Sequence, residues 1–338
     1  MPESTPQEQI SRMLTGYWLS QALYVAAKLG LADLVKAAPR SAPELATATG
    51  THTRALYRLL RALASVAVFA EDEQQRFRLT PMAECLLDAP GSQRALAIMS
   101  GEEHFRAFGD LLYSVQTGEP AFDRLMGAPV FDFLQAHPEQ ARIFDEAMTG
   151  VHGRETAAML EAYDFSGVRV LADIGGGSGS VVSAILKKYT QMHGILYDLP
   201  AVIERAAPRL AAAGLANRCQ AIGGSFFASV PIGANVYLMR HIIHDWDDDN
   251  CRLILHNIRQ VLPDHGRLLV VESVVPPGND PSFGKLLDLA MLVIPGGEER
   301  TAEEYRKLFH ATGFELTRIL PTTADVSVIE GKKFPGQA

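Results

Sequence analysis

The chain has 338 residues, more than one ordinary domain holds and enough for two. Hydrophobic residues make up 47% and charged residues 21%, the balance of a folded protein with apolar cores. The net charge of −8 argues against a general nucleic-acid-binding protein, which needs a basic face to neutralise phosphates. The three cysteines lie far apart, so neither a disulfide framework nor a zinc site is indicated.

The N-terminal residues are polar and acidic, unlike a signal peptide. No apolar run approaches the roughly 20 residues that span a bilayer. We therefore expect a cytoplasmic protein with no membrane partner.

The first third of the sequence predicts helices. Residues Ile10–Leu29 are predicted to form a long helix, and Gly30 follows as its expected C-cap. One apolar stripe of this helix holds Leu14, Trp18, Ala22 and Val25. Ser41 and Glu44 have the spacing of a capping box, which predicts the start of another helix.

A further helix over Thr51–Val66 and a hairpin over Phe69–Leu79 complete the outline of a winged-helix domain, a fold that often binds DNA. The helix carries three arginines at Arg54, Arg58 and Arg61, but four leucines share its surface and its neighbour is long and apolar. So much apolar surface on a small domain favours burial against another chain. We expect a homodimer without a nucleic-acid partner, and the arginines as a solvated face.

Residues 102–161 are predicted to form a helical connector that glycine and proline interrupt. From Val168 onward, short apolar runs alternate with helical stretches, which predicts a parallel sheet covered by helices. The predicted strands are Val168–Ile174, Gly194–Leu199, Gln220–Phe226, Val236–Ile243, Arg267–Val275, Phe314–Leu320 and Val326–Glu330. Helical segments are expected between the first six. A short turn joins the last two, which predicts an antiparallel hairpin at one edge.

A glycine loop follows the first of these strands. Gly175, Gly177 and Gly179 permit a tight turn and a close approach to a ligand, and the helix that follows has free N–H groups that favour an anion. The dinucleotide fingerprint G-x-G-x-x-G fits in neither register. With Asp173 ahead of it, the loop instead resembles that of S-adenosylmethionine-dependent methyltransferases.

Asp198 ends the second strand, about 20 residues past the loop, where an acidic side chain can accept hydrogen bonds from ribose hydroxyls. It could also cap the helix that begins after Pro200. After the third strand, Phe226 is expected to supply an apolar face to an adenine.

His244 follows the fourth strand, at the edge of the sheet where ligands bind. A histidine can take the proton from a phenol or an enol as its oxygen attacks a methyl group. The alternative is that His244 and Asp245 only begin the next helix, with Asp245 or Asp247 as N-cap. His241 is expected to point to the other side and to be structural.

At this point the sequence from about Gly109 to Lys332 resembles a known family, the small-molecule O-methyltransferases of plants and bacteria that act on caffeate, flavonoids and hydroxyindoles. The shared segments are Asp173–Gly179, Tyr197–Pro200, Arg240 with His244–Asp248, Glu272, and Gly296–Thr301. The family also begins with a winged-helix-like dimerisation domain.

The resemblance implies roles for individual residues. His244 would be the general base, and Glu272 and Glu299 would flank it and accept its other N–H. The residues implied at the cofactor are Gly175, Asp198, Leu199, Ser225, Phe226 and Arg240. Those implied at the methyl acceptor are Met148, Met291 and Ile294.

Two positions depart from the family pattern. Ser225 stands where members usually have an aspartate that contacts the adenine. His152 stands where a small hydroxyl residue is expected near the cofactor, so His152 and His104 could enter the acceptor pocket instead.

We therefore expect an α/β protein with a Rossmann-like, seven-stranded methyltransferase domain over residues 161–338. A winged-helix-like dimerisation domain would occupy residues 1–95, and a connector that contributes to the acceptor pocket would occupy 96–160. The expected reaction is methyl transfer from S-adenosylmethionine to an aromatic or enolic hydroxyl, without a metal. The alternatives are C-methylation or decarboxylation on the same scaffold, a regulator that binds the cofactor as effector, and a nicotinamide oxidoreductase.

Overall fold

The computed structural model describes residues 5–334, which form two compact units. One unit comprises the chain up to residue 106 together with 137–151, and the other comprises 107–136 together with the chain from residue 152. The connector expected over 96–160 thus contributes segments to both units. None of the helices in the described range is long and apolar enough to cross a membrane.

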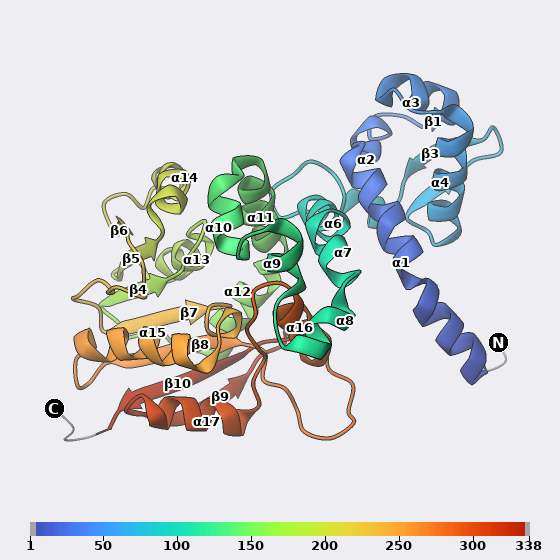
Figure 1. Cartoon of the computed structure of the whole chain (residues 1–338). Coiled ribbons are helices and arrows are strands. Elements are labelled where there is room, and N and C mark those ends of the chain that lie inside the picture. Colours follow the sequence, from blue (N-terminus) through green and yellow to red (C-terminus); the bar gives the residue numbers. More distant parts are fainter. Residues whose placement is uncertain (1–4, 335–338) are drawn as a thin grey trace. The chain divides into compact units, whose positions relative to one another are not determined.

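The first unit contains the predicted helix–turn–helix and hairpin (Figure 1). Its elements are α1 (Pro6–Lys28), α2 (Leu31–Leu34), β1 (Arg40–Ser41), α3 (Ala42–Thr49), α4 (Thr53–Ser65), β2 (Phe69–Glu71), β3 (Arg76–Leu79), α5 (Pro81–Glu84), α6 (Arg94–Gly101) and α11 (Pro138–Val151). The capping box at Ser41 and Glu44 is confirmed. Gly30 was expected as a C-cap, but Leu29 caps α1 and Gly30 is the N-cap of α2.

The N-terminal half of the predicted apolar stripe of α1 is exposed in the single chain, whereas Ala22 and Val25 are half-buried. Leu14 is 70% exposed and Trp18 is 62% exposed, although α1 continues into a buried segment at Ala26. Such an exposed apolar face on a long helix is the expected feature of a protein–protein interface.

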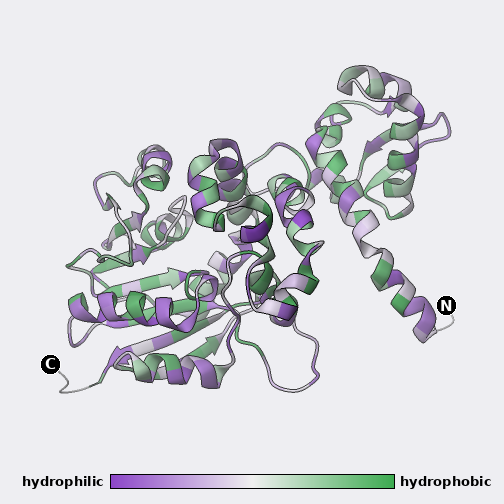
Figure 2. Ribbon diagram, viewed as in Figure 1, coloured by the Kyte–Doolittle hydropathy of each residue, from purple (hydrophilic) through white to green (hydrophobic). Residues whose placement is uncertain are grey.

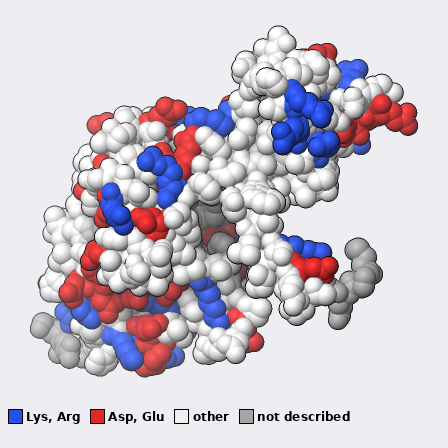
Figure 3. Space-filling view, turned by 45° about the vertical axis from the view of Figure 1, so that its right-hand side comes forward, with Lys and Arg blue, Asp and Glu red and all other residues white. Residues whose placement is uncertain are grey.

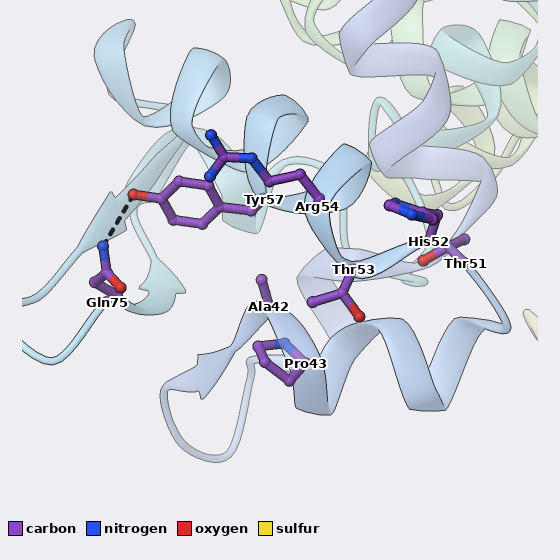
Figure 4. Close-up of a pocket in the computed structure, with 8 residues that line it drawn as sticks. All are labelled: Ala42, Pro43, Thr51, His52, Thr53, Arg54, Tyr57 and Gln75. Atoms are coloured by element: carbon purple, nitrogen blue, oxygen red, sulfur yellow. Dashed lines mark hydrogen bonds between the residues drawn. The ribbon is translucent and has the colours of Figure 1, made fainter.

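The same unit carries a group of basic side chains, visible in Figure 3. Arg54, Arg58 and Arg61 are exposed along α4, as expected of a solvated face. The start of α4 also lines a shallow hollow of about 600 Å³ (Figure 4). Its lining residues are Ala42, Pro43, Thr51, His52, Thr53, Arg54, Tyr57 and Gln75.

The second unit is built on a seven-stranded sheet of order β6-β5-β4-β7-β8-β10-β9. The strands are β4 (Val170–Ile174), β5 (His193–Asp198), β6 (Cys219–Gly223), β7 (Val236–Arg240), β8 (Arg267–Glu272), β9 (Phe314–Pro321) and β10 (Ser327–Lys333). The predicted antiparallel edge hairpin is confirmed, with β10 inserted between β8 and β9. The expected helix between β6 and β7 is absent, since residues 224–235 form turns.

Helices cover both faces of this sheet (Figures 1 and 2). Those of the unit's sheet region are α12 (Gly153–Ala162), α13 (Ser180–Lys188), α14 (Pro200–Ala212), α15 (Asp248–Val261) and α17 (Ala302–Ala311). Strand residues alternate between two cores: Leu238 packs with α12, α13 and α14, while Tyr237 and Met239 pack with α15 and α17. Because both faces are covered, the central strands are mostly apolar, with charged residues such as Asp173, Arg240 and Glu272 toward their carboxyl ends.

Short helices complete this unit. They are α8 (Leu111–Thr117), α9 (Ala121–Met126), α10 (Val130–Ala136), the 3₁₀ turn η1 (Ile243–Asp245) and α16 (Phe283–Val293), while α7 (Glu103–Phe108) spans the boundary between the units. A small core of Phe122, Val130 and Ile294 joins α9, α10 and the end of α16.

Candidate active site

The predicted site residues of the second unit gather where the parallel strands end. Strands β4, β5, β6, β7 and β8 run in the same direction and end at Ile174, Asp198, Gly223, Arg240 and Glu272. In an open parallel sheet this carboxyl edge is where ligands bind. The loops that follow these strands therefore carry the candidate site.

The glycine loop begins at Gly175, which has φ +67°. A Cβ at this position would lie 2.3 Å from Cδ1 of Ile242, so both the positive φ and the close approach to the turn after β7 favour glycine here. Asp198 holds the loop from the next strand: its carboxylate accepts hydrogen bonds from the N–H of Gly177 at 2.8 Å and of Leu199 at 2.7 Å. Asp198 therefore holds the glycine loop and does not cap α14, whose N-terminus has no side-chain cap.

An aromatic group lies beyond β6. Phe226 and Phe227 contact each other with ring centroids 4.8 Å apart, and Trp246 packs edge-on against Phe227 at 4.7 Å. Ser225 precedes them and accepts a hydrogen bond from the N–H of Phe227 at 3.3 Å. The indole N–H of Trp246 is buried without a hydrogen-bond partner in the described chain.

His244 lies on η1 and is only 5% exposed. Its Nδ1 is 2.6 Å from Oε1 of Glu299, as the resemblance implied, and its Nε2 is 3.6 Å from Oδ1 of Asp245. Burial alone would lower the pKa of His244, but Asp245 and the hydrogen bond to Glu299 outweigh burial and raise this pKa to about 10. The alternative was that this stretch begins the next helix with Asp245 or Asp247 as N-cap, and Asp247 is the N-cap of α15.

Glu272 makes no hydrogen bond to the imidazole of His244, which differs from the expected role. Its Oε1 accepts hydrogen bonds from the backbone N–H groups of Ile242, Ile243 and His244, at 3.0, 2.7 and 3.3 Å. Its Oε2 accepts one from the hydroxyl of Tyr305 at 2.5 Å. A buried carboxylate at the end of β8 therefore fixes the backbone of the turn that carries the histidine.

A second segment holds the same turn from the other side. Gly297 packs so closely that a Cβ there would lie 2.0 Å from the carbonyl oxygen of His244. Arg300, which is 1% exposed, donates to the carbonyl oxygens of Ile243 and Trp246 at 3.2 and 3.1 Å. The segment Gly296–Thr301 thus presents Glu299 to His244.

Sequence reasoning missed Tyr305, Arg300 and Asp245 as parts of this arrangement. The side chain of Asp245 is 16% exposed, and desolvation raises its pKa to about 7 although the charge of His244 opposes this effect. The sequence offered one signal for Arg300, because it directly follows Glu299 in the Gly296–Thr301 segment that the family shares. Tyr305 carries no sequence signal, since a tyrosine on an apolar helix face usually belongs to the core.

His241 does not point away from the site, which corrects the prediction that it faces the other side. Its ring centroid lies 4.8 Å from that of His244 and 4.3 Å from that of His152, on which it is stacked at 13°. Its Nε2 is 2.9 Å from Oε2 of Glu155. Arg240 lies nearby and donates to the carbonyl oxygen of His152 at 3.2 Å and to the hydroxyl of Thr156 at 2.8 Å.

The remaining predicted residues divide between the units. Met291 lies on α16, and Ile294 is buried just after that helix. Met148 on α11 belongs to the first unit, where it packs on a core with Met99 and Ile143. His104 lies on α7 in the same unit.

Ligand atoms of His152, Glu155 and His241 lie within 4.8 Å of one another, a spacing that a metal ion can occupy. The two imidazoles are nearly parallel at 13°, however. Imidazole nitrogen binds a metal in the plane of its ring, so two stacked rings cannot direct their lone pairs at one ion. The arrangement fits hydrogen bonding and packing better than metal binding.

The chain is similar to known proteins over most of its length. Residues 108–315 match the O-methyltransferase domain family, and residues 11–89 match the O-methyltransferase dimerisation domain. The chain is 48% identical to a phenazine O-methyltransferase of Lysobacter antibioticus, over 95% of this chain and 94% of that protein.

Two solved structures are similar along nearly the whole chain. The mitomycin 7-O-methyltransferase is 37% identical with a TM-score of 0.91, over 97% of this chain and 98% of that one. An O-methyltransferase of neocarzinostatin biosynthesis, solved with S-adenosylmethionine and 2-hydroxy-5-methyl naphthoic acid, is 32% identical with a TM-score of 0.83, over 94% and 96%. The predicted fold class is confirmed by these similarities.

Proposed function

We propose that this chain, which belongs to the family of S-adenosylmethionine-dependent small-molecule O-methyltransferases, methylates a hydroxyl of an aromatic acceptor with His244 as the general base. The chain is a methyltransferase and its cofactor is S-adenosylmethionine. The observation that carries the proposal is the buried pair of His244 and Glu299 at the carboxyl edge of the sheet.

The residues around the glycine loop fit the cofactor. Gly175 keeps the loop close to the β7 turn, and the carboxylate of Asp198 has oxygens at the loop that can accept further hydrogen bonds, as a ribose requires. Leu199, Ser225, Phe226 and Arg240 end or follow the adjacent strands and would frame the rest of the molecule. Bound S-adenosylmethionine supplies a methyl group on a positively charged sulfur.

His244 would remove the acceptor's proton at Nε2. Glu299 accepts the hydrogen bond from Nδ1–H, so in the neutral, base form of the ring it fixes the tautomer in which Nε2 carries no proton, and it stabilises the imidazolium that forms. A neutral phenol is a poor nucleophile, and loss of its proton during attack contributes about 10² to 10⁴ in rate.

The acceptor would be a fused or substituted aromatic ring. This class is suggested by the relatives, among them one that acts on phenazines and one solved with a hydroxynaphthoic acid. His152, Met291 and Ile294, which all belong to the second unit, are the residues that we propose to contact it.

The N-terminal unit would form a homodimer through α1. The match to a dimerisation domain and the exposed side chains of Leu14 and Trp18 support this assembly. Light scattering on the purified chain and on a Trp18→Asp variant tests it, with a dimer expected for the first and a smaller species for the second.

The reaction itself is tested with labelled cofactor and a panel of hydroxylated phenazines, naphthoates and benzoates. We expect transfer of the labelled methyl to oxygen, identified by the carbon chemical shift of the new methyl group. Methylation only at nitrogen or carbon would contradict the proposal.

A further inference from the structure

A second histidine–carboxylate pair lies beside the first. Nε2 of His241 is 2.9 Å from Oε2 of Glu155, and the two side chains are 9% and 13% exposed. The ring of His241 contacts that of His244, with centroids 4.8 Å apart and planes inclined at 41°. The pair is therefore buried next to the proposed base, unlike a surface ion pair of little consequence.

The backbone at His241 is unusual. Its φ is +53°, in the left-handed region, which among the described non-glycine residues only Ala67 and Gln75 share. Residues with a Cβ occupy this region rarely and keep it only where the surroundings enforce it. Here the left-handed residue directly follows β7, at the turn where the rings of His241 and His244 lie together.

A second ring, that of His152, also packs against His241. His152 stacks on it with centroids 4.3 Å apart, and Arg240 holds the backbone of His152 through its carbonyl oxygen. Burial, together with the charges of His241 and Arg240, lowers the pKa of His152, so His152 is an uncharged ring in this stack. The packing therefore leaves His241 little freedom to rotate.

We propose that His241 is a positioning residue for His244 in methyl transfer and that Glu155 holds it in place. The hydrogen bond from His244 to Glu299 directs the Nδ1–H bond, but a single hydrogen bond constrains the tilt of the imidazole plane only weakly. A ring packed against His244 fixes the plane of the imidazole, and with it the direction in which Nε2 points. The inference rests on the proposed role of His244 as base.

A double-mutant cycle tests this coupling. His241→Asn is the first variant, because asparagine tolerates the left-handed region. It is measured in the wild-type background and in the His244→Gln background, with His193→Asn, at an exposed position of β5, as the matched control. We expect kcat to fall by about ten-fold or more in the wild-type background, since misalignment of a reacting group is costly. In the His244→Gln background the same change should alter kcat by less than about two-fold. The Kd for S-adenosylmethionine, measured by calorimetry, should stay the same throughout.

Equal losses in the two backgrounds would overturn the inference, because His241 would then act independently of His244. Wild-type turnover of His244→Gln would remove the proposed base and this inference together, so the two failures are distinguishable. If His241→Asn is unfolded at the assay temperature, Glu155→Gln provides the same cycle while keeping the size of the side chain. Its expected result is again a loss that disappears without His244.

Discussion

Nδ1 of His244 lies 2.6 Å from Oε1 of Glu299, although 55 residues separate them in the sequence. The histidine is placed by the turn after β7, and the glutamate by the segment that follows α16. Another carboxylate holds the backbone of each residue. Glu272 accepts a hydrogen bond from the N–H of His244, and Asp288 accepts one from the N–H of Glu299 at 2.8 Å. The geometry of the pair therefore depends on the contact between these two segments.

That contact predicts the effect of Gly297→Ala. A Cβ at this position would lie 2.0 Å from a backbone oxygen, so one segment must move and Glu299 would be displaced from His244. We expect kcat to fall by about 10², together with a lower melting temperature. Gly153→Ala is the control, because nothing lies within 4 Å of a Cβ there. Equal activity of the two variants would refute the role assigned to this segment.

Asp198→Ala should weaken cofactor binding by about ten-fold or more, because hydrogen bonds to a charged acceptor are lost and the glycine loop loses its tie at Gly177. Calorimetric titration with S-adenosylmethionine measures this directly. An unchanged Kd in a folded variant would remove Asp198 from the cofactor site.

The charge around His244 predicts a pH dependence. Asp245 and Glu299 raise the pKa of His244, so the proton at Nε2 is held at neutral pH and the base form increases as pH rises. We expect log kcat/KM to rise with a slope of about one per pH unit below that pKa. Asp245→Asn removes a negative charge, which should move the profile to lower pH. A profile that keeps its position in this variant would show that Asp245 does not set the pKa.

Much of the fold could be predicted because most strands of the sheet are short, apolar and separated from the next strand by a helix. The prediction of a helix between β6 and β7 was wrong, because turns connect these two strands. A connection made of turns has no apolar stripe that would distinguish it in the sequence. His241 was misplaced because a regular strand would direct it away from His244, and a left-handed residue is not visible in the sequence.

The site could be predicted less completely. Glu299 next to His244 followed from the family resemblance and is found there, whereas Glu272 holds backbone N–H groups instead of the imidazole. Sequence spacing identifies a carboxylate near a turn, but it cannot tell which donor the carboxylate meets. Tyr305, which binds Glu272, was missed for the same reason.

The central claim is that His244 removes the acceptor's proton. The most direct measurement is the pH–rate profile of His244→Gln beside that of the wild type, with an identified phenolic acceptor and with Kd for the cofactor measured in parallel. The account predicts an unchanged Kd, a loss of about 10² to 10⁴ in kcat at neutral pH, and recovery as the pH approaches the pKa of the acceptor hydroxyl, where the acceptor ionises unaided. A folded His244→Gln variant that turns over at the wild-type rate at neutral pH would contradict it.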